Sequence, residues 1–205
     1  MLQYLVLFSL LFSLNWVIIY IKNTLVGKAK PNKISWLMWS LGPIVATFVE
    51  LSKGVTWAAL PVFLSGFGPL CVFIAALFSK KAYWKSTVFD YFCGLFSLLA
   101  LVLWLAVKEV NISIIFAIIS DFSAAIPTIK KSWTHPETEV AASYFLGTLS
   151  ALTSFAAIKY WIFPEYGFPF YLVILNTLIG LFIIRHKMFK TSISSSKNNK
   201  LTRLP

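Results

Sequence analysis

Charged residues are scarce in this chain. Only 12% of its 205 residues are Asp, Glu, Lys or Arg, which is about half the share of an average soluble protein. Hydrophobic residues make up 59%, and the mean hydropathy is +0.80. This composition excludes an ordinary soluble domain and predicts an all-α integral membrane protein.

The residues that catalysis and metal binding require are also few. The two histidines, His135 and His186, fall outside the predicted membrane core. The sequence shows no carboxylate pair, no nucleophile beside a base and no spacing of metal ligands. The two cysteines, Cys71 and Cys93, lie within apolar runs, where we expect them to pack as small apolar residues. We therefore expect neither an enzyme nor a bound cofactor or metal.

Long apolar runs recur along the chain, and each can cross about 30 Å of hydrocarbon. The sequence predicts seven transmembrane helices, at residues 2–21, 35–52, 56–79, 88–107, 111–129, 142–162 and 167–185. The remaining segment, residues 186–205, is rich in Ser, Asn and Lys. That composition cannot bury a core and predicts a disordered basic tail.

Lys and Arg are distributed unevenly between the two ends of these helices. One side collects 15 of the 18, including the C-terminal tail, and the other side collects 3. Because basic residues gather in cytoplasmic loops, this predicts an outside N-terminus and a cytoplasmic C-terminus in the cell membrane. The net charge of +11 then needs no nucleic acid as a partner, and the lipid bilayer is the expected surrounding.

A weak internal repeat relates the two halves of the chain. One constant shift brings Pro31 onto Pro136 and Trp39 onto Tyr144. Few identities survive, so chance agreement is the alternative. Topology supports a duplication independently, because a 3+1+3 order of helices gives both triplets the same orientation. The predicted parts are a first three-helix repeat (1–79), a linker helix (80–110), a second three-helix repeat (111–185) and the tail (186–205).

Two segments carry a resemblance to the PQ-loop superfamily, which includes the SWEET sugar transporters and nicotinamide riboside-type vitamin transporters. The segment IPTIKKSWTHPETEVAASYFLG (126–147) looks like a Pro-Gln at a helix end, a Lys-rich turn and a span with an early Gly. NTLIG (176–180) is similar to an Asn-x-x-x-Gly segment in the third helix of SWEET repeats. The chain departs from the pattern at Thr128, which stands where Gln is expected, and at Tyr20 in the first repeat.

The resemblance implies a transporter or facilitator of a small polar molecule, such as a sugar, nucleoside or vitamin precursor, working by alternating access. It also implies hinge or gating positions at Pro127, Thr128 and Tyr20. Sorting receptors share this architecture, so a non-transporting receptor or accessory protein is the alternative. Two repeats in one chain could complete a pathway as a monomer, and an oligomer stays open.

Asp121 lies near the middle of the predicted helix at 111–129. A charged group at bilayer depth costs about 2.5–3.5 kcal/mol, so it normally faces a cavity or a partner. Asp121, Ala124 and Thr128 share one helix face. Asp121 is therefore a candidate to accept hydrogen bonds from a substrate or to couple transport to protons. An internal pair is the structural alternative.

Other polar and aromatic residues are expected near the same depth. The predicted substrate-binding residues are Asp121, Asn176, Asn15, Ser13, Ser120, Ser123, Trp39 and Tyr144. A repeat would place Ser13 and Asn15 opposite the residues near Asp121. Asn176 could instead join two helices, and the two aromatic residues could belong to an interfacial belt.

Four charged residues, Lys130, Lys131, Glu137 and Glu139, follow Pro127 at the predicted cytoplasmic end of the helix. Water is within reach at that depth. We therefore expect all four to be solvated.

Overall fold

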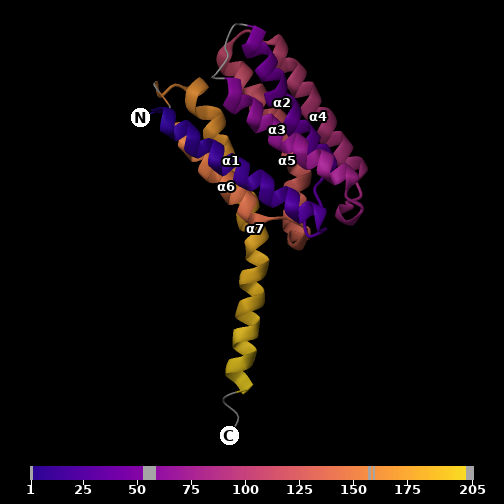
Figure 1. Ribbon diagram of the computed structural model, residues 1–205. Coiled ribbons are helices and arrows are strands. Elements are labelled where there is room, and N and C mark those ends of the chain that lie inside the picture. The colour runs from indigo at the N-terminus through magenta and orange to yellow at the C-terminus, as the bar shows by residue number, and fades with distance from the viewer. Residues whose placement is uncertain (1, 53–58, 157, 159, 202–205) are drawn as a thin grey trace.

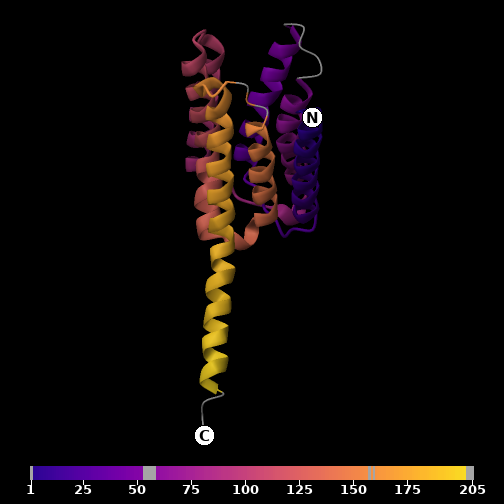
Figure 2. The same ribbon diagram turned by 90° about the vertical axis from the view of Figure 1, so that its left-hand side faces the viewer.

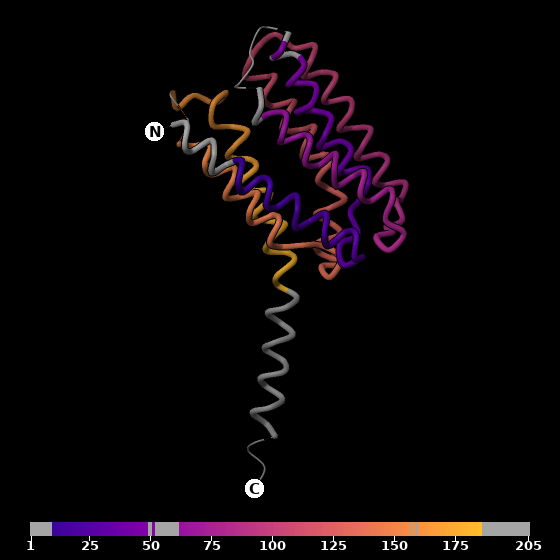
Figure 3. Tube along the Cα trace, viewed as in Figure 1, coloured from indigo at the N-terminus to yellow at the C-terminus, as the bar shows by residue number. Residues whose placement is uncertain are grey.

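The structure is a computed structural model that describes the backbone of residues 2–52, 59–156, 158 and 160–201. Side chains are described for residues 10–48, 51, 62–156, 158 and 160–185. Figure 3 draws this part of the chain in colour.

Within the described residues the chain is all-helical and forms no strand (Figure 1). The α-helices are α1 (Leu2–Leu25), α2 (Lys33–Ser52), α3 (Ala59–Phe78), α4 (Val88–Ala106), α5 (Val110–Thr134), α6 (Ala141–Phe155) and α7 (Phe163–Leu201). Two short 3-10 turns, η1 (Lys80–Ala82) and η2 (Pro136–Thr138), lie in the connections. The seven predicted helices are therefore confirmed as helices.

The observed ends of several helices differ from the predicted ones, and α1 continues to Leu25 rather than ending at residue 21. α5 continues to Thr134 with Pro127 inside it, because a helical proline is tolerated where neighbouring groups satisfy the freed carbonyl. α6 ends at Phe155, well before the predicted residue 162. α7 begins at Phe163, since Pro164 in a first turn lacks only an N–H that would be unpaired there. The backbone of residues 186–201 continues α7 as a helix, which differs from the disordered tail predicted at residues 186–205, and residues 202–205 lie outside the described part.

Three helices are long and apolar enough to cross a membrane: α4, α5 and the Phe163–Arg185 part of α7. Two further apolar helical stretches, Leu10–Leu25 and Val62–Phe78, are shorter. Large apolar side chains on α4, among them Phe92, Phe96 and Val102, are more than half exposed. Soluble monomers rarely expose an apolar face of this kind, so the surface agrees with a helical protein associated with a membrane.

The helices pack in a regular order (Figures 1 and 2). α3 packs against both α1 and α2, and α7 packs against both α5 and α6. Two further contacts, α1 with α6 and α2 with α5, join these groups, and α4 packs on α5 and α2. Residues far apart in the sequence are thus brought together at the α1–α6 and α2–α5 contacts.

Side-chain caps define the starts of α4 and α5. The Thr87 hydroxyl accepts the backbone N–H of Asp90, whose carboxylate accepts the N–H of Thr87 at 2.7 Å. The Glu109 carboxylate accepts the N–H of Ile112 at 2.6 Å, and this hydrogen bond lowers the pKa of the Glu109 carboxyl. Both caps satisfy amides that a helix start leaves unpaired.

Aromatic rings fill the contact between α1, α2 and α6. Tyr20 and Trp36 are buried, with ring centroids 4.5 Å apart. Trp36 also packs edge-on against Trp39 at 5.2 Å, and Tyr20 against Tyr144 at 6.3 Å. This cluster is continuous with buried aliphatic residues of α7 such as Ile179. The core therefore lies between the two groups of helices.

Gly66 allows α2 and α3 to approach closely. A Cβ atom on Gly66 would lie 2.9 Å from the carbonyl oxygen of Ser40 and 3.0 Å from the amide nitrogen of Ile44. Small residues at such contacts let helix backbones come together in the membrane. At Gly42 the same atom would meet only Leu101 Cδ1, at 3.8 Å.

We predict that Gly66→Ala destabilises the protein by about 1–3 kcal/mol, because the added methyl group overpacks a backbone contact. The melting temperature in detergent should fall, by about 2–4 °C for each kcal/mol. Gly42→Ala is the matched control and should not lower it, since its methyl group has room. Equal melting temperatures for the two variants would contradict the close contact.

Candidate functional site

Asp121 lies where α2, α5 and α7 meet. Its Oδ2 atom accepts a hydrogen bond from the Tyr171 hydroxyl of α7 at 2.7 Å. Its backbone carbonyl accepts the indole N–H of Trp39, from α2, at 3.2 Å. The predicted proximity of Asp121 and Trp39 is thus observed, and the carboxylate has an internal partner.

Sequence reasoning missed Tyr171. A buried tyrosine hydroxyl usually finds a hydrogen-bond partner. The position of Tyr171 within the predicted membrane helix that also holds Asn176 was therefore the signal that this hydroxyl needs a partner. Sequence spacing alone does not say which residue of another helix that partner is.

The face of α5 that follows Asp121 toward the C-terminal end of the helix is buried, as expected. Ala124 and Thr128 have relative exposures of 1% and 0%, and Pro127 is buried between them. The side chains at 124 and 125 are small, so they protrude little from this face of α5. The structure therefore gives α5 an inward face that begins at Asp121.

Ser13 and Asn15 lie away from Asp121. The Ser13 hydroxyl is 3.0 Å from the hydroxyl of Ser150 on α6. Asn15 is exposed and donates to the carbonyl of Leu11 within its own helix at 2.8 Å. The predicted meeting of these residues with the Asp121 region is wrong, because α1 packs on α3 and α6 rather than on α5.

The remaining predicted polar residues occupy three other places. Ser120 is buried against α4, where its hydroxyl donates to the carbonyl of Ser97 at 2.8 Å. Asn176 donates to Leu172 in its own helix at 2.9 Å, and its side chain packs on Gly147 of α6. Ser123 is half-buried on α5. None of these three hydrogen-bonds to Asp121 among the described contacts, and the described hydrogen bond of Asn176 stays within α7.

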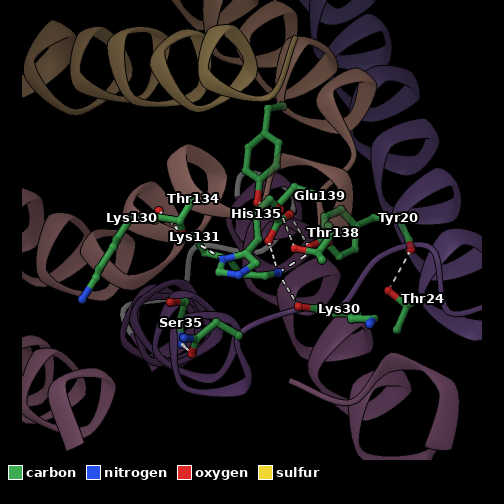
Figure 4. Close-up of polar contacts among 12 residues, drawn as sticks. Tyr20, Thr24, Lys30, Ser35, Lys130, Lys131, Thr134, His135, Thr138 and Glu139 are labelled. Carbon is green, nitrogen blue, oxygen red and sulfur yellow. Dashed lines mark hydrogen bonds and ion pairs between the residues drawn. The ribbon is translucent and has the colours of Figure 1, made fainter. Parts of the chain in front are cut away.

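A buried ion pair lies at the C-terminal end of α5, away from Asp121 (Figure 4). Lys131 Nζ is 2.6 Å from Glu139 Oε1, with side-chain exposures of 1% and 0%. The same ammonium donates to the backbone carbonyls of Lys30 and Thr138. It also lies 4.8 Å from the centroid of the Trp84 ring. The expectation that Lys131 and Glu139 are solvated is therefore wrong.

Two tyrosines complete the coordination of Glu139. Its Oε2 atom accepts the Tyr20 hydroxyl at 2.6 Å and the Tyr144 hydroxyl at 3.0 Å. Both predicted residues, one a gating and one a substrate-binding candidate, thus belong to this network. The carboxylate is shared by a lysine on one oxygen and two phenols on the other.

The chain folds into this arrangement through the 3-10 turn after α5. The N–H of His135 bonds to the carbonyl of Lys131 at 2.7 Å and closes the helix. The next residues, Pro136–Thr138, turn the chain back so that Glu139 reaches Lys131. The N–H of Lys30 bonds to the Thr138 carbonyl at 2.9 Å, which joins the α1–α2 and α5–α6 connections directly.

The sequence carried a partial signal for this pair. Ala124, Thr128 and Lys131 follow at i, i+4 and i+7, so Lys131 continues the inward stripe of α5. Proximity to the helix end argued for solvation instead. The deciding factor was the turn at Pro136, which covers Lys131 with the Thr138 carbonyl and the Glu139 carboxylate, while the Lys30 carbonyl comes from the α1–α2 connection.

The network's hydrogen-bonding capacity is largely used. The Lys131 ammonium has three donors, and it faces Glu139 and two carbonyls. Within the described part of the chain, no group of three or more His, Cys, Asp or Glu side chains could hold a metal ion. The arrangement therefore suits a structural tie between helices. Asp121 is half-buried, and its described side-chain partner is Tyr171.

Comparisons with protein-family models, with curated proteins and with solved structures gave no match to this chain.

We predict that Glu139→Gln destabilises the protein by about 3–5 kcal/mol, because it leaves the Lys131 charge buried without a counter-ion. Thermal unfolding in detergent measures the effect. Glu137→Gln is the matched control, since Glu137 is exposed two residues earlier, and it should be close to neutral.

The double variant Lys131→Met with Glu139→Gln should recover a large part of the loss, because no uncompensated charge remains. Equal stability of Glu139→Gln and Glu137→Gln would show that the pair is not buried in solution.

Proposed function

We propose that this protein is a multi-pass transporter or facilitator of a small polar molecule, working by alternating access around Asp121. The observation that carries the proposal is the carboxylate of Asp121 inside a helix of membrane length, at the contact of α2, α5 and α7. An acidic group at such depth is expensive and commonly marks a substrate or ion pathway.

The packing order supports the proposed 3+1+3 repeat. Exchanging α1, α2 and α3 for α5, α6 and α7 turns the α1–α3 and α2–α3 contacts into α5–α7 and α6–α7. The same exchange turns the α1–α6 contact into α5–α2. Two hydrogen bonds follow this relation: Trp39 donates to the Asp121 carbonyl, and Ser143 donates to the Trp16 carbonyl at 3.2 Å. Transporters with parallel repeats hold their ligand between the repeats.

The distribution of charge supports the proposed orientation in the cell membrane. The α1–α2, α3–α4 and α5–α6 connections lie at one end of the bundle (Figure 1). That end carries exposed lysines such as Lys28, Lys81 and Lys85. Basic connections face the cytoplasm, so the ion pair would close the cytoplasmic end of the path.

In this mechanism the Lys131 network holds the two repeats together at the cytoplasmic end. Tyr20 and the Lys30 carbonyl come from the first repeat, whereas Lys131, Glu139 and Tyr144 come from the second. Opening toward the cytoplasm would separate these groups. Opening toward the other side would leave them in contact while exposing Asp121.

A non-transporting receptor or accessory protein is the second candidate. The specific observation in its favour is the hydrogen bond from Tyr171 to Asp121, which gives the carboxylate an internal partner without any ligand. In that role Asp121 would serve the packing of α5 on α7. The two candidates differ in what a ligand does to the purified protein.

We predict that a small polar molecule stabilises the purified protein in a thermal-shift screen of sugars, nucleosides, vitamin precursors and amino acids. At 100 times its dissociation constant it should add about 2.7 kcal/mol. Asp121→Asn should abolish this shift because the acceptor charge is lost. Asn15→Ala is the matched control and should keep the shift, since Asn15 is exposed and bonded within its own helix.

Uptake of the identified ligand into proteoliposomes then separates transport from binding. A ligand that binds but is not taken up would favour the receptor. The absence of any ligand, with Asp121→Asn as stable as the unaltered protein, would favour an accessory role.

The proposed orientation is tested by single cysteines at the two ends of α4, in a protein with Cys71 and Cys93 replaced by Ala. Lys108→Cys should react with an impermeant maleimide on intact cells. Lys85→Cys should react only after lysis. Both positions are exposed, so access to reagent alone decides the result. Reaction of both on intact cells would contradict the membrane crossing of α4.

A further inference from the structure

The start of α2 and the inward face of α5 carry a group of buried polar atoms without hydrogen-bond partners. Six buried side-chain atoms in the described part of the chain lack such a partner, and five of them lie at the start of α2 or on α5, two helices that pack together. They are Asn32 Nδ2, Ser35 Oγ, Trp36 Nε1, Thr128 Oγ1 and Ser132 Oγ. We call these five residues the α2–α5 seam. Each has a relative exposure of 3% or less.

Helix geometry places these residues on two facing stripes. Asn32, Ser35, Trp36 and Trp39 follow at i, i+3, i+4 and i+7, which is one face at the start of α2. Asp121, Thr128 and Ser132 follow at i, i+7 and i+11, which is one face of α5. The Trp39 indole bonds to the carbonyl of Asp121, so the first stripe faces the second.

The seam ends at the buried ion pair. Ser132 follows Lys131 directly, and Asn32 lies two residues after Lys30, whose carbonyl accepts the Lys131 ammonium. Figure 4 draws Ser35 in the same close-up as that pair. The side-chain oxygen of Asn32 is already used, because it accepts the backbone N–H groups of Ile34 and Ser35 at 3.1 and 3.3 Å. Its amide nitrogen is therefore the group left over.

The number of unpartnered groups is informative. A buried hydroxyl or amide without a partner is strongly disfavoured, and natural proteins leave very few. The seam holds two obligate donors, Asn32 Nδ2 and Trp36 Nε1, and three hydroxyls that can donate or accept. An uncharged molecule that both donates and accepts satisfies all five. A buried water typically makes about three hydrogen bonds.

We propose that the α2–α5 seam binds a small cluster of internal water molecules, about two in number, between Asp121 and the Lys131–Glu139 pair. The waters join α2 to α5 where the side chains do not reach each other directly. They also form a hydrogen-bonded connection along the face of α5, from Asp121 toward the end of the bundle that carries the exposed lysines. This inference holds whether or not the protein transports a ligand.

Nuclear magnetic resonance of the full chain in detergent micelles tests the proposal. The indole N–H of Trp36, assigned through Trp36→Phe, should show a cross-peak to long-lived water. Thr128→Val, which keeps the shape and removes one hydroxyl, should weaken this cross-peak at least twofold. A Trp36 indole without a water cross-peak would overturn the proposal. A cross-peak that Thr128→Val leaves at full strength would also overturn it.

The direction of the change in melting temperature tests the proposal independently. If waters bind the seam, Thr128→Val and Ser132→Ala each remove a partner of the cluster, and the melting temperature should fall by about 2–4 °C. If the seam is dry, the same changes remove an unpaired hydroxyl, and the melting temperature should rise. Thr24→Val is the matched control, because the fully buried Thr24 hydroxyl bonds to the Tyr20 carbonyl at 2.9 Å. A rise in both seam variants, with a fall in the control, would count against the waters.

Discussion

Pairing of the buried Lys131 charge is the constraint on which the end of the bundle depends. An ammonium taken out of water is costly unless its donors meet acceptors and its charge meets a counter-ion. Lys131 satisfies this requirement with Glu139 and two backbone carbonyls, those of Lys30 and Thr138. Those contacts fix the turn after α5 and bring the α1–α2 connection onto it. Tyr20 of α1 and Tyr144 of α6 then donate hydrogen bonds to the other oxygen of the Glu139 carboxylate.

The rest of the architecture follows from an apolar surface that cannot face water. Helices satisfy their own backbone hydrogen bonds, which is why an all-helical chain suits a membrane. Because lipid is as apolar as leucine, close packing there depends on small residues and shared hydrogen bonds. Gly66 between α2 and α3 and Gly147 beside Asn176 serve that purpose. The apolar outer face of α4 needs no protein partner in such surroundings.

α5 links the two polar regions of the protein. Its inward stripe runs from Asp121, held by Tyr171, to Lys131, held by Glu139. Between these two charges lie small or hydroxylated residues, among them Ala124 and Thr128. Because the two charges stand at opposite ends of this stripe, a tilt of α5 against α2 would part the contacts at one end and keep those at the other. This coupling is the physical basis for proposing Asp121 as a binding group and the ion pair as a closing contact.

The sequence by itself determined the helices. Apolar runs recur along the chain, and their positions matched all seven α-helices of the described residues, three of which are long and apolar enough to cross a membrane. It also identified Asp121 as exceptional, since a carboxylate in an apolar run is unusual in any fold. Helix periodicity placed Ala124 and Thr128 on the same inward face, as the structure confirms.

Only the tertiary structure decided which groups meet. Hydrogen bonds between helices depend on rotation and depth, and these are set by packing that one-dimensional spacing does not encode. Asn15 therefore lies exposed on α1, Ser120 faces α4, and Tyr171 holds Asp121. The burial of Lys131 had the same origin. Its charge predicted solvation, but a turn beginning at Pro136 covers it, and burial is a property of the folded surroundings rather than of the residue.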